Sequence, residues 1–374
     1  MKRVHIIEEI DLAKEVFTST DVISEGASME SYINEVQLKC NIDLSNLSCV
    51  VRNFPFFMEG NRHTIIRQKV LKHIGTNAKL ASWEPIIDKS LNEALDNIKS
   101  KKQIDLLADF VNPFLQKTTC TLLGILTKDP IKFEKCTNLA EELLNPLLPI
   151  RTLKKMDSAF TEFLEEVLSK EPAKEIDGNI PLLTALLKEP IEGFSRKDIT
   201  ALVLVIYAGT IALRHTLANI IFRILTSTKT IKQAAARSEW VHANLDYLIR
   251  ESVAVKKVSR LSKEPFTLGS LNIKKNDKLI IDLQAVHHGT SGQCPLHKNI
   301  NLKNENLKDN SHLAFGRGSH FCLGVNYSKI IFEKIIPVLF KEYPNLALQS
   351  DLPDLFEHSQ MLSVKTLHCH LGDY

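Results

Sequence analysis

The segment 311–324, Ser-His-Leu-Ala-Phe-Gly-Arg-Gly-Ser-His-Phe-Cys-Leu-Gly, constrains this chain more than any other stretch. It sets Cys322 in a glycine-rich loop ahead of a long apolar-periodic segment. Gly316 and Gly318 predict a tight turn that lets the backbone approach a flat group closely. A thiolate is a strongly donating iron ligand; Phe315 can cover the sulfur, and a following helix would direct its amides toward it. The plain alternative is a glycine turn with a buried free cysteine.

The whole pattern Phe-Gly-x-Gly-x-His-x-Cys-x-Gly, from Phe315 to Gly324, resembles the haem-binding loop of the cytochrome P-450 superfamily. The resemblance implies a mainly α fold with a small β region, the triangular cytochrome P-450 fold, in which a long central helix crosses the haem. It also implies haem b as the cofactor and Cys322 as the ligand of its iron. The cofactor-binding positions that it implies in this loop are Phe315, Gly316, His320, Cys322 and Gly324.

Composition is that of an ordinary soluble globular protein, with 44% hydrophobic and 24% charged residues. A net charge of +3 without a dense basic run argues against a nucleic-acid partner. Seven scattered cysteines favour reduced thiols in a cytosol. The N-terminus lacks a signal-peptide core, and the longest strongly apolar run, 199–213, is shorter than the roughly 20 residues of a membrane span. We therefore expect a cytoplasmic protein without a membrane anchor, folded as a single domain over 1–374.

Two further segments supply candidate ligands for carboxylates. His63 and Arg67 lie four residues apart on a predicted helix, which puts both donors on one face. An ordinary surface pair is the alternative interpretation. The resemblance implies that both bind a haem propionate, where an arginine can act bidentately, and that Arg260 on a predicted strand binds the second.

Periodicity predicts the remaining elements. The region 24–60 is expected to hold strands and loops around 36–38 and 49–51, and the resemblance makes 47–58 a substrate-facing loop. We predict a substrate lid near 146–149 and a last substrate-facing turn at 361–364. Helices are predicted at 11–17, 86–98, 104–126, 133–148, 153–168 and 327–343, and strands at 4–7, 255–260, 266–269, 271–273, 278–283 and 368–370.

A capping-box-like start, Ser195-Arg-Lys-Asp198, opens a helix of about 30 residues that should be buried because its first half is apolar all round. Ala208 and Gly209 lie in its middle. Close helix packing would explain this small pair, and the resemblance implies instead that it makes room for oxygen and substrate above the haem.

Here the sequence departs from the family, in which an acid and an alcohol follow and deliver protons to the haem-bound oxygen. This chain has Ile211 and Ala212. A hydroxyl remains on Thr210, one residue early, so Ala208, Gly209 and Thr210 are the catalytic candidates. Arg214 and His215 lie one turn further, where a pocket-facing and a packed or solvated position are both open.

A second departure concerns the family's Glu-x-x-Arg pair, because Tyr247 stands where the glutamate is expected and only Arg250 remains. A lone buried guanidinium is costly. We expect the Tyr247 hydroxyl, Asp246 or backbone carbonyls to substitute. In the family a third residue, an arginine upstream of the haem loop, joins this pair. Here Lys303 and Lys308 are the nearby cations.

Histidines and a cysteine also gather in 287–297, namely His287, His288, Cys294 and His297. They could bind zinc, but their spacing fits no standard ribbon, and a polar loop is the simpler interpretation. His368 and His370 are expected to share one exposed strand face.

Three functions remain open. The first is a haem-thiolate monooxygenase or oxidase that acts on a small molecule of secondary metabolism, with electrons from an external ferredoxin or flavodoxin. Lys329, Lys334 and Lys341 are candidates for docking such an acidic partner. The second is a haem-thiolate enzyme that uses peroxide, reduces a small molecule, or catalyses a dehydration or isomerisation. The third is a non-catalytic haem-containing binding or scaffold protein.

Overall fold

The computed structural model describes residues 3–145, 148–289, 296, 300, 312–350, 354–357 and 360–372. Hypotheses that fall outside these residues concern Pro146, Leu147, Cys294, His297, Lys303, Lys308 and Ser311. The helices are α1 (Ile10–Thr18), α2 (Met29–Cys40), α3 (Ser45–Arg52), α4 (Gly60–Ile74), α5 (Asn77–Ala81), α6 (Glu84–Ile98), α7 (Asn112–Leu123), α8 (Pro130–Asn138), α9 (Ile150–Leu168), α10 (Leu182–Lys188), α11 (Arg196–Ala208), α12 (Thr210–Leu225), α13 (Lys229–Ala235), α14 (Ser238–Ser252), α15 (Leu283–His288) and α16 (Val325–Glu342).

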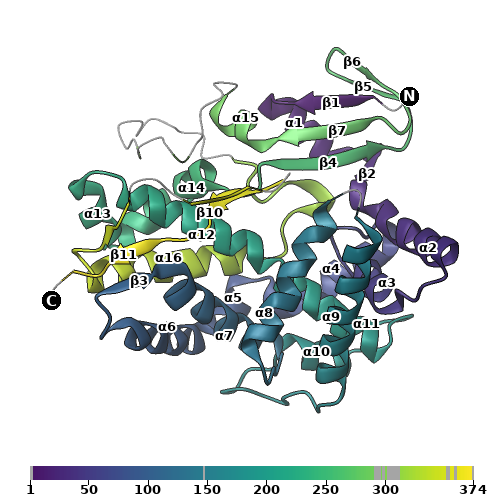
Figure 1. The fold of residues 1–374 in the computed structure, drawn as a ribbon. Coiled ribbons are helices and arrows are strands. Elements are labelled where there is room, and N and C mark those ends of the chain that lie inside the picture. Colours follow the sequence, from purple (N-terminus) through teal and green to yellow (C-terminus); the bar gives the residue numbers. More distant parts are fainter. Residues whose placement is uncertain are drawn as a thin grey trace.

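Strands form four small sheets, the largest of which lies at the top of the molecule in Figure 1. The largest has the order β1-β7-β4-β2, with β1 parallel to β7 and the other pairs antiparallel. Its strands are β1 (Val4–Ile7), β7 (Lys278–Asp282), β4 (Lys257–Ser262) and β2 (Val22–Ser24). The others are β3 (Gln103–Asp105) with β11 (His368–His370) and β8 (Ala347–Leu348), β5 (Phe266–Leu268) with β6 (Leu271–Ile273), and β9 (Leu355–Glu357) with β10 (Leu362–Val364).

The long central helix is the axis of the core. Ser195 and Asp198 form the predicted capping box, each side chain bonding the other residue's backbone N–H. Helix α11 leads through Gly209 into α12, and Leu217, Ala218 and Ile220 in α12 are fully buried. By length and composition Arg196–Leu225 could cross a membrane, but 72% of its most apolar window is buried inside the structure. That burial is typical of the core helix of a globular protein.

The region after β2 is wrong in the sequence-based prediction. Residues 36–38 lie in α2 and residues 49–51 in α3, where strands or loops were expected. Local β-branched content favoured strands, but α3 packs between α9 and α11 and buries Leu47, Val50 and Val51 on them. Tertiary burial of an apolar helix face overrides weak local propensity.

The predicted helix 104–126 is also divided. Its first residues pair as β3 with β11, a π-helical turn follows at Leu107–Val111, and α7 begins at Asn112. The strand β11 has the expected alternation, with His368 and His370 exposed and Cys369 buried.

Candidate active site

The loop that carries Cys322 turns as its glycines predict. Gly316 and Gly318 have φ angles of 68° and 72°, which side chains other than glycine rarely tolerate. The Cys322 N–H donates to the Phe315 carbonyl, 2.9 Å away, which closes the turn. At Gly318 an added Cβ would lie 2.4 Å from the Phe17 carbonyl oxygen, so this glycine lets the loop pack on α1.

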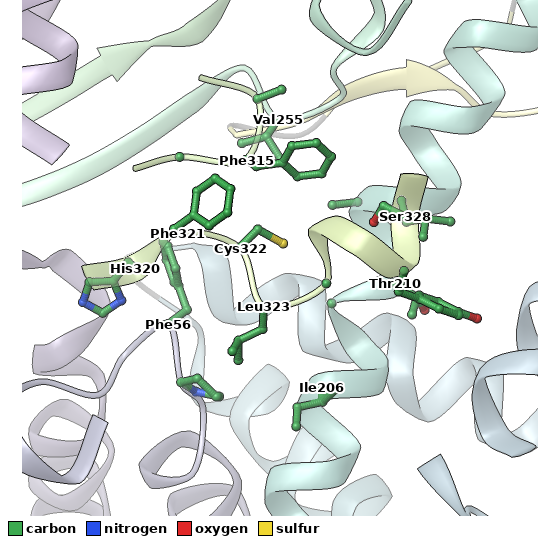
Figure 2. Close-up of a pocket in the computed structure, with 18 of the residues that line it drawn as sticks. Phe56, Ile206, Thr210, Val255, Phe315, His320, Phe321, Cys322, Leu323 and Ser328 are labelled. Carbon is green, nitrogen blue, oxygen red and sulfur yellow. The ribbon is translucent and has the colours of Figure 1, made fainter. Parts of the chain in front are cut away.

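Cys322 lies just ahead of α16, and its sulfur lies among the residues that line a cavity (Figure 2). Burial raises the pKa of the thiol, while the Gly324 N–H that bonds the sulfur and the nearby Arg67 charge act to lower it. A helix N-terminus and a cation both stabilise a thiolate. The site therefore contains groups that favour sulfur as an anionic ligand.

A cavity of about 330 Å³ brings most of the sequence-predicted residues together. Cys322 lines it from the loop before α16, and Arg260 lines it from strand β4. The other predicted site residues in its wall are Arg67, Gly209, Thr210, Phe315, Gly316, His320 and Gly324. Ala208 lines an adjoining chamber instead, and His63 lies behind His320.

Two histidines and a glutamate contact one another at this wall. His63 is buried and stacks on His320, with ring centroids 4.2 Å apart. Glu59 lies 3.4 Å from His320 Nε2 and accepts from the Ser24 N–H at 2.7 Å. Burial would raise the pKa of Glu59, but His320 and that N–H lower it. Sequence reasoning missed Glu59.

Arg67 and Arg260 differ in environment. Arg67 donates to the Phe321 carbonyl at 2.5 Å, directly beside Cys322. Arg260 is 4% exposed and donates to the Ser259 carbonyl at 3.0 Å. Burial lowers the pKa of Arg260 to about 10. No carboxylate of the described residues lies within ion-pair distance of either guanidinium.

These groups fit a haem. The buried Nε2 atom of His63 has no hydrogen-bond partner among the described residues, and Arg260 is a buried cation without a carboxylate. Buried charges are normally paired. A haem b carries two propionates, so the donor set matches the acidic edge of that group, and the sulfur matches its iron.

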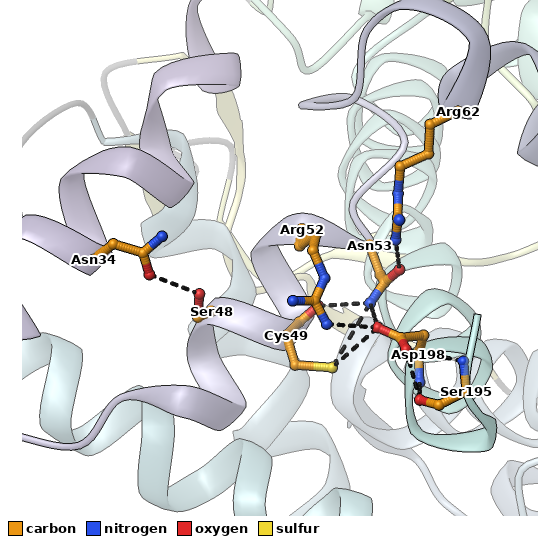
Figure 3. A network of polar contacts seen from close by, with 8 residues as sticks. All are labelled: Asn34, Ser48, Cys49, Arg52, Asn53, Arg62, Ser195 and Asp198. Carbon is orange, nitrogen blue, oxygen red and sulfur yellow. Dashed lines mark hydrogen bonds and ion pairs between the residues drawn. The ribbon is translucent and has the colours of Figure 1, made fainter. Parts of the chain in front are cut away.

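A polar network holds the loop 53–59 over this cavity. In Figure 3 the side chain of Asp198, at the start of α11, accepts from Arg52 at 2.7 Å and from Asn53 at 2.8 Å. Arg62 at the start of α4 in turn donates to Asn53 at 2.8 Å. Both ends of the loop are thereby fixed to the long helix. Within it, Phe54, Pro55 and Phe56 line the cavity, whereas Leu47 of the expected substrate-facing stretch is buried in α3.

The long central helix contains no acid at position 211 and no alcohol at position 212. Ile211 is buried and Ala212 lines the cavity. The Thr210 hydroxyl also reaches the cavity wall, but it donates to the Tyr207 carbonyl of its own helix at 2.7 Å. Its proton is therefore already engaged.

The core behind the loop has a substitute for the missing glutamate, and it is not the one expected. Arg250 Nη2 lies 3.0 Å from Glu251, the next residue, which also contacts Arg223 and His288. The Tyr247 ring lies 5.7 Å below the Arg250 guanidinium, and Asp246 pairs instead with Lys329 and His312. Sequence reasoning missed Glu251, although it is adjacent to Arg250 in the chain.

Other hypotheses meet the structure as follows. The described residues hold no group of three or more His, Cys, Asp or Glu that could bind a metal ion. His287 instead accepts a hydrogen bond from the Leu313 N–H at 3.0 Å. Lys329 pairs with Asp246, and Lys334 with Glu84 and Asp88, which weakens their availability for a partner. Met361 lines the chamber beside the main cavity, but Leu362–Val364 form strand β10 where a turn was predicted.

Comparison with known proteins gives one family. No family model matches the chain. A "Cytochrome P450" of Bacillus subtilis (strain 168) is 23% identical over 296 residues, which cover 77% of this chain and 70% of the relative. "Polyketide biosynthesis cytochrome P450 PksS" of the same organism is 24% identical over 325 residues, 86% of this chain and 77% of the relative. Among solved structures, P450BioI in complex with hexadec-9Z-enoic acid ligated acyl carrier protein superimposes with a TM-score of 0.82 at 15% identity, covering 98% of this chain and 91% of that one.

The mainly helical fold, with its small sheets and 30-residue central helix, is the cytochrome P450 fold. The chain belongs to the cytochrome P450 superfamily, in its bacterial type, and is an oxidoreductase of that class. The family implies a haem cofactor.

Proposed function

We propose that this protein is a haem-thiolate monooxygenase, folded as one domain over 1–374, that acts on a small molecule of secondary metabolism in the cytoplasm. The observation that carries the proposal is Cys322, whose sulfur lines an apolar cavity and accepts the Gly324 N–H at the start of α16. Membership of the P450 superfamily supports the reaction class. The likeness to PksS, whose name places that protein in polyketide biosynthesis, supports the class of substrate.

Each part of the site has a proposed task. Cys322 holds the iron, and Arg67, Arg260 and His63 hold the haem propionates. The bound haem would supply oxygen activation, with electrons from an external ferredoxin or flavodoxin. Phe54 and Phe56 close the cavity against water, which keeps the reacting region dry.

A second function within the same family is favoured by one observation. Ile211 and Ala212 cannot donate protons, and the Thr210 hydroxyl is bonded to its own helix. A protein that uses peroxide, or that rearranges its substrate without net oxidation, has less need of proton delivery than one that reduces oxygen. This is the alternative that turnover experiments must separate.

The reduced protein under carbon monoxide tests the proposal directly. We expect the Soret band at the long wavelength of thiolate ligation, and we expect Cys322→Ser to abolish that shift. Cys40→Ser is the matched control, because Cys40 is exposed and far from the cavity wall. An unchanged spectrum in Cys322→Ser would refute the assignment. Turnover with a reductase system against turnover with peroxide alone then decides between the two functions.

A further inference from the structure

A second chamber of about 210 Å³ adjoins the main cavity on the side of the central helix where the acid and alcohol are missing. Ala208 and Ile211 belong to its wall. The residues that line both spaces are Phe54, Phe56, Gly209, Ala212, Val255 and Val258. Because these residues belong to both walls, the two spaces lie next to each other.

The wall of this chamber is mostly apolar and contains one well-buried carboxylate. Glu141 comes from the 3-10 turn Leu139–Leu144, and its side chain is 12% exposed. Lys257 also lines the chamber, but its side chain is 40% exposed and its Nζ lies 3.6 Å from Asp282. An acceptor among apolar walls favours a ligand that brings a donor, because an acceptor oxygen that loses its water when a ligand binds needs a new partner.

Two side chains of α12 hold this carboxylate in place. Arg214 Nη2 and His215 Nε2 lie 3.5 and 3.4 Å from Oε1 of Glu141. His215 is itself fixed, because its Nδ1 is 2.5 Å from the Ser363 hydroxyl and its ring stacks on Phe356 at 5.0 Å. The structure shows no hydrogen bond to Oε2 of Glu141 among the described residues. One oxygen is thus clamped, and the other retains its capacity to accept.

The charges around Glu141 leave it attractive to a cation. Arg214 also pairs with Glu134, whose Oε1 lies 3.3 Å from Nη1. Two carboxylates therefore share one guanidinium. Burial lowers the pKa of His215, so near neutral pH the imidazole adds no charge to the cluster. The cluster of Glu134, Glu141 and Arg214 then carries a net charge of −1.

We propose that Glu141 binds the ammonium group of an elongated, mainly apolar ligand whose other end lies in the part of the main cavity lined by Gly209 and Ala212. The proposal rests on the proposed function, since it is the haem-side end of such a ligand that would react. It adds what the substrate carries: an amine separated from the reacting carbon by an apolar stretch that spans both spaces.

Calorimetric titration of the haem-loaded protein at pH 7 tests this with a matched pair of probes, decylamine and 1-decanol. A charge-assisted hydrogen bond predicts that the amine binds about tenfold to hundredfold more tightly than the alcohol. In Glu141→Gln that preference is expected to fall to about threefold or less. Glu142→Gln is the control, because Glu142 lies on the same 3-10 turn as Glu141 but does not line the chamber; it should retain the preference.

An amine preference that persists in Glu141→Gln overturns the proposal, because the amine then binds elsewhere, for example directly to the iron. If Glu141→Gln does not keep the wild-type circular dichroism spectrum, Arg214→Met provides the second test. Removing the competing cation should tighten amine binding several-fold, and unchanged or weaker binding refutes the anchor. These titrations need no electrons, so their failure leaves the carbon monoxide test of Cys322 unaffected, and the reverse also holds.

Discussion

Replacing Glu251 with glutamine is expected to destabilise the protein more than any surface charge change. Glu251 lies at the meeting point of Arg223, Arg250 and His288, at 3.7, 3.0 and 3.4 Å. The Arg223 side chain is 1% exposed and that of Glu251 12%. Glutamine keeps the shape of the side chain but removes the charge, which leaves a buried guanidinium without its carboxylate.

The size of the effect follows from the pKa of Glu251. Burial alone would raise it, but His288, Arg223 and Arg250 together lower it from 4.5 to about 2. At about 1.4 kcal/mol per pKa unit, that shift corresponds to about 3 kcal/mol of stability at neutral pH. With a typical unfolding entropy per residue, Glu251→Gln should then lower the Tm by roughly 4 °C.

The sign of the pH dependence gives a second observable. Because the folded-state pKa is depressed, the stabilisation is present above 4.5 and is lost as the pH falls toward 2. The difference in unfolding free energy between wild type and Glu251→Gln should therefore shrink over that range. Unfolding in guanidinium chloride, followed by far-UV circular dichroism, measures this difference. Glu264→Gln is the control, since Glu264 and Lys275 are 64% and 58% exposed and their pair should contribute less than about 1 kcal/mol. A Glu251→Gln variant as stable as this control would refute the reasoning.

Two further predictions concern the stability at acid pH and the long central helix. Burial lowers the pKa of His287 to about 3, so between pH 6.5 and pH 3 the imidazole binds a proton in the unfolded chain but not in the folded one. The free energy of unfolding should therefore fall over that pH range, by on the order of 5 kcal/mol at most. Unfolding titrations of His287→Gln should show a shallower decline. Restoring the acid and alcohol with Ile211→Glu and Ala212→Thr should raise the ratio of product to electrons consumed, because a positioned general acid contributes typically 10²–10⁴-fold. Tight coupling in the unmodified protein, on a substrate with no polar group near the reacting carbon, would contradict that view of the helix, and Thr210→Val would then be the next variant to examine.

The parts of the fold that the sequence predicted well are those with strong local signals. The capping box at Ser195, the strand that pairs as β1 and the glycines of the Cys322 loop each determine backbone geometry within a few residues. Helix α3 was missed because its short apolar stretch gains helical structure from packing against α9 and α11, and α2 in turn packs against α3; a single sequence does not show such partners.

The site divides in the same way. Cys322, Phe315 and Gly316 belong to one continuous motif, and they meet in the cavity. Glu59 and Glu141 belong to no such motif. Glu141 contacts His215 from more than 70 residues away in the sequence, and Glu59 contacts His320 from more than 250 residues away. Only the fold brings those pairs together, and no spacing in the sequence indicates them.

The two departures from the family pattern have different consequences. A buried guanidinium requires a nearby negative charge but not a particular direction of approach, so Glu251 can serve Arg250 in place of a residue at position 247. Proton delivery is different, because the donor must lie within hydrogen-bond reach of the reacting group. Glu141 faces the chamber beside Ile211 but is clamped by Arg214 and His215. The charge pairing behind the Cys322 loop is therefore retained through Glu251, whereas positions 211 and 212 of the long central helix carry no group that can donate a proton.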